Sequence, residues 1–178
     1  MIASLFEPVP GFDQPIAVLK HCHDRIRKQI RTMQNLLQHL PQSGADSEAQ
    51  QGAAAVLKYF DQAAPNHHAD EEQDLLPMLQ ASARGEDAAL LDRVLPDVLR
   101  EHQLMDEAWQ VLATQLNAIA SGSAAILSTD AVAQFAELYS AHMEKEETQI
   151  APMAKRIFTA EQMAQLGHAM AARRGIAI

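Results

Sequence analysis

The sequence contains few of the residues that build disulfides, sheets or membrane spans. Its one cysteine, Cys22, cannot form an internal disulfide, which favours a reducing compartment. Aromatic residues make up only 4% of the 178 residues, and aliphatic side chains dominate the 48% that are hydrophobic. No apolar run reaches the roughly 18 residues of a membrane span, and Met1–Phe12 has no secretion-signal pattern. We therefore expect a cytoplasmic, all-α protein that does not enter a membrane.

Positive charge is also scarce. The chain has 14 Lys and Arg residues against 23 Asp and Glu residues, for a formal net charge of −9. Such a surface repels the phosphate backbone, so we do not expect nucleic acid to be a partner. The chain has eight histidines, which is an unusually high number, and the interpretation below depends on their spacing.

Apolar residues recur at helical spacing in four long stretches. The first runs from Ile16 and should end at Pro41 and Gly44; the others cover about 47–80, 87–120 and 129–158. We expect a kink or irregular turn near Pro65, and Pro96 is tolerated within the third stretch.

The segment Thr159-x-x-Gln162 has the form of a capping box, which predicts the start of a short fifth helix. Short connections between four long helices predict an antiparallel up-down-up-down four-helix bundle with a short additional C-terminal helix. The length fits a single domain over 1–178, with a bundle core at about 16–158.

The two halves of the chain share one pattern of chemistry-bearing residues. In each half, a histidine is followed one helix later by a His-x-x-x-Glu pair and then by a proline. These residues are His23, His67, Glu71 and Pro77 in the first half, and His102, His142, Glu146 and Pro152 in the second. Residues four apart lie on one helix face, about 5–6 Å apart at Cβ, so each pair can present a nitrogen and a carboxylate to one point.

The positions of the turns predict that the two halves meet. In an antiparallel hairpin, residues equidistant from the turn lie at the same height. The midpoint of His23 and His67 is Ala45, and that of His102 and His142 is Gly122; both lie in predicted turns. The midpoint between Glu71 and His102 also lies beside the predicted break between the second and third helices. We therefore predict that four histidines and two glutamates share one level of the bundle.

A single His/Glu pair at this spacing is usually an ordinary surface pair. Burying the whole set without a partner would cost several kcal/mol, and a pair of metal ions removes that penalty. Each ion would receive two imidazoles and two shared carboxylates, with an oxide or hydroxide bridge and room for a small exogenous ligand. The lone cysteine excludes Cys-rich zinc sites, and the Glu-x-x-His pairs of ferritin-type centres do not occur.

These motifs resemble the hemerythrin-like family of histidine/glutamate cation-binding domains over about Ile16 to Phe158. The resemblance rests on His23, on His67 and Glu71 in His-His-Ala-Asp-Glu-Glu, on His102, and on His142 and Glu146 in His-Met-Glu-Lys-Glu-Glu. It implies that these six residues ligate two non-haem iron ions inside a four-helix bundle. Family members bind oxygen, respond to oxygen, nitric oxide or iron, or help to repair iron–sulfur clusters.

The chain departs from the oxygen carriers of that family at one ligand. They have a fifth histidine on the third helix, where this sequence has Val98 or Asp106. That departure argues against reversible oxygen carriage and leaves Asp106 or His68 open as an additional ligand. His68 and Glu72 are turned by about 100° from the ligand pair, so we expect them behind the ligands or in solvent.

The sequence is compatible with three functions. The leading one is a di-iron protein that binds or senses a small diatomic ligand, O2 or NO, or the iron or redox state. The alternative is a di-iron enzyme or iron donor in nitric oxide or peroxide stress or cluster repair, and the third is a metal-free helical interaction module. The short fifth helix and the apolar tail at 176–178 are candidates for a homodimer contact.

Overall fold

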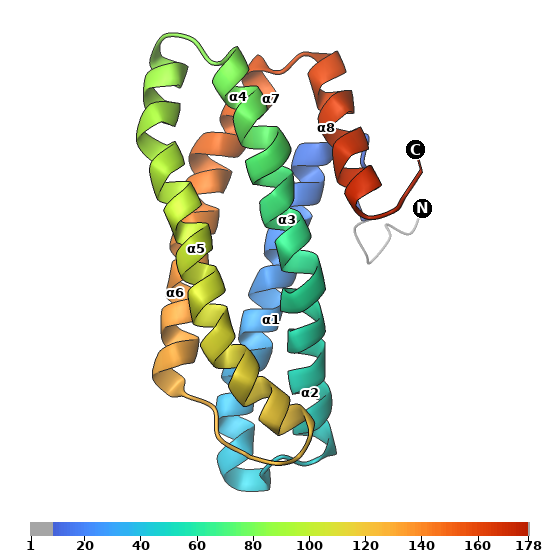
Figure 1. Cartoon of the computed structure of the whole chain (residues 1–178), viewed down its shortest axis with the longest axis vertical. Helices are drawn as coiled ribbons and strands as arrows, with labels where there is room; N and C mark the ends of the chain where they lie inside the picture. The colour runs from blue at the N-terminus through green and yellow to red at the C-terminus, as the bar shows by residue number, and fades with distance from the viewer. Residues whose placement is uncertain (1–8, 178) are drawn as a thin grey trace, which may run out of the picture.

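The computed structural model describes residues 9–177, and the regular structure within this range is entirely helical (Figure 1). The predicted all-α class is therefore confirmed. Ile178, part of the tail proposed for a homodimer contact, lies outside the described residues. The elements are α1 (Pro15–Ser43), α2 (Ser47–Lys58), η1 (Tyr59–Ala63), α3 (Ala64–Asp70), η2 (Glu71–Leu75), α4 (Leu76–Ser82), α5 (Glu86–Ala120), α6 (Thr129–Lys145), η3 (Glu146–Ile150), α7 (Ala151–Ile157) and α8 (Ala160–Arg173), where η marks a π-helical turn.

The long helical segments lie side by side and are joined by short connections at the two ends of the molecule. Figure 1 shows the chain reversing at one end after α1 and α5, and at the opposite end after α4 and α7. Helix α2 packs against α1 and α5, and α6 packs against α5 and α1. The shorter helix α8 folds back against α1, α3 and η2. Each long segment therefore has two long neighbours, and the site described below lies between them.

The helix ends follow the sequence signals with small differences. Helix α1 does not end at Pro41 but continues through it to Ser43, because a proline in the last turn removes only one hydrogen bond. Gly44 then takes a φ of 65°, and its N–H donates to the Leu40 carbonyl. The capping box at Thr159 is confirmed, with hydrogen bonds in both directions between Thr159 and Gln162.

Three π-helical turns interrupt the second and fourth long segments. Each begins six residues before a proline, and the pairs are Tyr59 with Pro65, Glu71 with Pro77, and Glu146 with Pro152. A proline has no N–H to donate and crowds the carbonyl four residues back. Widening the turn relieves that crowding, and the Glu71 and Glu146 carbonyls accept from the N–H five residues later. The irregularity predicted near Pro65 is thus a π turn, and two further π turns start at the candidate ligands.

The apolar interior consists of two clusters separated by a polar layer. Along α1, Leu19 belongs to one cluster and Ile26 to the other, and His23 lies between them. Along α5, His102 lies in the same way between Val98 and Met105. The apolar spacing of each helix is therefore interrupted once, at the same level, by a buried histidine.

Helix α8 approaches the start of the chain so closely that only glycine fits at one position. A Cβ atom at Gly167 would lie 1.9 Å from the carbonyl oxygen of Phe12, which is backbone and cannot rotate away. Gly52, in α2, offers a matched comparison. A Cβ there would make only ordinary contacts, the nearest at 3.6 Å to Leu36.

We expect the two substitutions to have opposite effects on the free energy of unfolding. Gly167→Ala should lower it by about 1–3 kcal/mol through overpacking. Gly52→Ala should raise it by about 0.5–1 kcal/mol, because alanine favours a helix more than glycine does. Chemical denaturation followed by circular dichroism measures both. Stabilisation by Gly167→Ala would show that α8 is not held against Phe12.

Candidate metal centre

The structure brings the six predicted ligand residues together in the polar layer. All six are at most 4% exposed: His23, His67, Glu71, His102, His142 and Glu146. The ring centroids of His23 and His67 lie 4.9 Å apart, and those of His102 and His142 lie 4.7 Å apart. The predicted convergence of four histidines from four long segments is therefore confirmed, while their ligation of metal stays a prediction.

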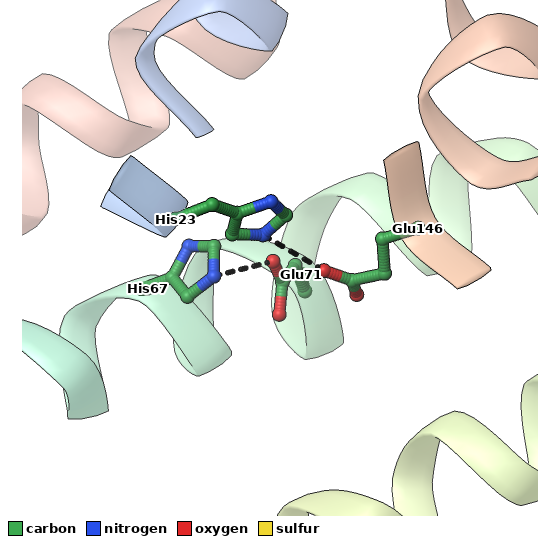
Figure 2. A group of neighbouring side chains, drawn as sticks. All are labelled: His23, His67, Glu71 and Glu146. Atoms are coloured by element: carbon green, nitrogen blue, oxygen red, sulfur yellow. Dashed lines mark hydrogen bonds and ion pairs between the residues drawn. The ribbon is translucent and has the colours of Figure 1, made fainter. Parts of the chain in front are cut away.

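The six side chains form two overlapping groups of four that share both glutamates. The first group is His23, His67, Glu71 and Glu146 (Figure 2). The second replaces the two histidines with His102 and His142. Within each group, one ligand atom from every residue lies within 4.8 Å of the others. Two neighbouring cations could therefore each be surrounded by two imidazoles and two carboxylates.

Each shared carboxylate directs one oxygen toward each group. The Glu71 oxygens lie 3.1 Å from His67 Nε2 and 3.3 Å from His102 Nε2. The Glu146 oxygens lie 3.1 Å from His23 Nε2 and 3.3 Å from His142 Nε2. This arrangement suits carboxylates that bridge two cations, because each oxygen faces a different pair of imidazoles.

Three further carboxylates hold the outer nitrogens of the histidines. Glu147 lies 2.9 Å from His23 Nδ1, Glu72 lies 2.6 Å from His102 Nδ1, and Glu101 lies 3.0 Å from His142 Nδ1. An ionised carboxylate can only accept, so these three imidazoles donate from Nδ1. In the neutral form of each ring, Nε2 then carries a lone pair that faces the centre, which is the tautomer a metal ligand needs.

Sequence reasoning identified Glu72 only as lying behind the ligands or in solvent, and it missed the function of Glu101 and Glu147. A signal was available, because each of the three carboxylates is the immediate chain neighbour of a predicted ligand. The distances show which neighbours turn inward. The sequence repeat has one exception. Cys22 precedes His23 at the position where Glu101 precedes His102, so the first half has a thiol in place of this carboxylate.

The donor set fits cations and fits poorly without them. The Nε2 atoms of His102 and His142 lie 3.1 Å apart, and both are assigned lone pairs by the tautomers above. The buried oxygens Glu71 Oε2 and Glu146 Oε1 and both ring nitrogens of His67 have no hydrogen-bond partner within residues 9–177. Lone pairs and carboxylates that converge in a buried layer repel one another. A cation in each group converts this repulsion into attraction.

The ionisation of the buried groups supports the same conclusion. Burial, and then the surrounding imidazoles, lower the pKa of His67 well below its usual value, so its ring is neutral and able to bind a cation. Burial, and then the charge of Glu146, raise the pKa of Glu71 well above its usual value. Two carboxylates at this depth are therefore not both ionised unless positive charge is supplied between them.

Other candidate residues lie outside both groups. Asp106 is exposed and belongs to neither of them. His68 is buried rather than solvated, and its ring stacks on His102 with centroids 4.1 Å apart. His39 binds Asp46 at the far end of α1, and His168 is exposed on α8. His23 is thus the member of the His21–His23 triplet that the structure buries.

Comparisons with known proteins agree with this geometry. An uncharacterized protein of Haemophilus influenzae is 26% identical over 165 residues, which cover 93% of this chain and 92% of that protein. No described helix is long and apolar enough to cross a membrane. The family model described as the hemerythrin HHE cation binding domain matches residues 14–154, a span that contains both halves of the repeat and all six predicted ligands. The chain therefore belongs to the hemerythrin HHE cation-binding family.

Proposed function

We propose that this chain is a non-haem di-iron protein that binds or senses a small diatomic ligand, O2 or NO. The six residues His23, His67, Glu71, His102, His142 and Glu146 would hold two iron ions within an up-down-up-down four-helix bundle that carries α8 as a short additional helix. Iron supplies reversible electron transfer and an open position for a small ligand, which four imidazoles and two carboxylates support.

One observation carries the proposal: each of the two buried glutamates directs one oxygen toward each pair of histidines. A site for one cation would need only one oxygen from each carboxylate. The matched carboxylates at three Nδ1 atoms add support, because they fix the ring orientations and make the imidazoles stronger ligands.

Elemental analysis with a visible spectrum tests this proposal directly. Purified protein reconstituted with ferrous iron under argon should contain close to two irons per chain. Its spectrum should change when air or nitric oxide is admitted and return when the gas is removed or the iron is reduced. A protein that stays free of iron, or holds one iron per chain, would refute the di-iron proposal.

An enzymatic alternative is favoured by a pocket that reaches the centre from the surface. It has a volume of about 460 Å³ and includes His23, Glu71 and Glu146 in its lining. Sustained consumption of nitric oxide or hydrogen peroxide in the presence of an added electron donor would identify an enzyme. A single stoichiometric reaction per centre would identify a binding or sensing protein.

A further inference from the structure

The pocket that reaches the centre does so on one side only. It opens between α1, η2 and the η3–α7 segment, and its innermost residues are His23, Glu71 and Glu146. Of the four candidate histidines only His23 lines it, and His67, His102 and His142 do not. A molecule entering from this side would therefore meet the cation of the first group. We call this space the α1–α7 pocket.

The α1–α7 pocket is much larger than a diatomic ligand requires. Its volume is about 460 Å³, whereas a water molecule in the liquid occupies about 30 Å³. Pockets that hold small organic molecules have volumes of roughly 300–1,000 Å³. The space is therefore of the size expected for an organic ligand.

Most of the pocket wall is hydrocarbon, and Thr148 is a polar residue in its lining. Ile16 and Leu19 from α1, Leu75 from η2 and Ile150 from η3 all line it, and each is at most 5% exposed. Such walls favour methylene groups, with a gain of about 0.8 kcal/mol for each one that is buried. These four side chains offer no hydrogen-bonding group for a sugar or a nucleotide along this part of the pocket.

The two ends of the pocket favour a negative charge on the ligand. At the inner end, two divalent cations would carry more charge than Glu71 and Glu146 neutralise. At the rim, Lys155 is exposed to solvent, and Lys20 is exposed and lies 3.5 Å from Asp24. Glu147 also lines the pocket, but its carboxylate is held by Arg27 and by His23 Nδ1, each at 2.9 Å.

We propose that the α1–α7 pocket binds a short-chain aliphatic monocarboxylate of roughly four to eight carbon atoms. Its carboxylate lies toward the cation held by His23 and His67, and its alkyl chain lies against Ile16, Leu19 and Ile150. The inference rests on the proposed di-iron function, since an inner end without cations would present two acidic side chains to the ligand. It goes beyond that function by assigning a second class of ligand, an organic carboxylate, to the first cation.

Titration calorimetry with a series of carboxylates tests the proposal on the iron-loaded full chain. Acetate, butyrate and hexanoate present the same head group with increasing chain length. At about 0.8 kcal/mol per methylene, each added methylene should lower Kd about fourfold. Hexanoate has four more methylenes than acetate and should therefore bind about 250-fold more tightly.

A substitution that fills the pocket tests the same proposal and has a matched control outside the pocket. Ala17→Phe places a ring on the α1 wall of the pocket and replaces none of the candidate ligand residues. It should keep two irons and the affinity for acetate while losing the gain from chain length. Ala133→Phe, at an exposed position of α6 outside the pocket, should keep that gain.

The outcomes separate this proposal from the di-iron function. Equal affinity for acetate and hexanoate in protein with two bound irons overturns the carboxylate pocket and leaves the di-iron proposal intact. An Ala17→Phe variant that retains the preference for hexanoate also overturns the carboxylate pocket and leaves the di-iron proposal intact. A chain that takes up no iron overturns both.

Discussion

Replacing Glu146 with alanine should release both cations, whereas replacing His102 with alanine should release one. Glu146 belongs to both groups of four, so its loss leaves each cation with three of its protein ligands. His102 belongs only to the second group, and the first group keeps His23, His67, Glu71 and Glu146 without it. Glu146→Ala also removes half of the negative charge that offsets the two cations. The two single substitutions should therefore differ in stoichiometry.

Metal content per folded chain is the measurement, at a total iron concentration no more than about tenfold above the wild-type Kd. We expect close to two irons in the wild type, one in His102→Ala and almost none in Glu146→Ala. Glu147→Gln is the matched control at the neighbouring position. It keeps all six ligands and weakens the contacts of residue 147 with His23 Nδ1 and Arg27, so the affinity should fall about 10- to 100-fold and two irons should bind once the iron concentration is raised by the same factor. One tightly bound iron in Glu146→Ala would contradict a shared ligand.

The sequence was sufficient to predict the helices and the polar layer for identifiable reasons. The layer interrupts an otherwise regular apolar spacing, and the turns at Gly44 and Gly122 set which residues lie at equal heights. Because antiparallel neighbours must match in height, the positions of the histidines relative to those turns constrain them in three dimensions. The six residues could thus be selected without knowledge of any side-chain rotamer.

The features that escaped prediction depend on rotation about a helix axis or on contacts between distant segments. A π turn shifts every following residue around the axis. Pro65 indicated an irregularity but not its type, and the π turns before the prolines at 77 and 152 were not predicted. Glu101 and Glu147 looked like solvated charges because their neighbours in sequence are charged or polar too. Only the side-chain distances show that they hold the outer nitrogens of His142 and His23.

The attachment of α8 is the clearest long-range feature. Asp70, which precedes the candidate ligand Glu71, is fully buried, and Arg174 holds both of its oxygens at 2.7 and 3.1 Å. Arg173 also contacts Asp70 and bonds to Asp74 at 2.6 Å. About 100 residues separate these arginines from their partners, so no local pattern predicts the pairing. Through these hydrogen bonds the arginines hold α8 against the segment that contains His67 and Glu71.

Removing both arginines should therefore be costly. Arg173→Ala with Arg174→Ala leaves the Asp70 carboxylate buried without a counter-charge, which is expected to lower the free energy of unfolding by about 3 kcal/mol at neutral pH. Asp70→Asn is the matched control. It keeps an acceptor for the arginines and buries no charge, so its cost should be about 1 kcal/mol. Adding Asp70→Asn to the double variant should restore part of the lost stability.

The pH dependence distinguishes an unpaired charge from simple loss of packing. Burial already raises the pKa of Asp70, and the two arginines oppose that shift. Without them the folded-state pKa rises further above the unfolded value of about 3.9. The folded double variant then binds more protons than its unfolded form, so its stability falls as pH rises through that range. Its deficit relative to wild type should be small near pH 4 and complete by pH 8, as measured by urea denaturation across the series. A deficit that is constant with pH would mean that α8 is held by its apolar face and not by the buried Asp70 carboxylate.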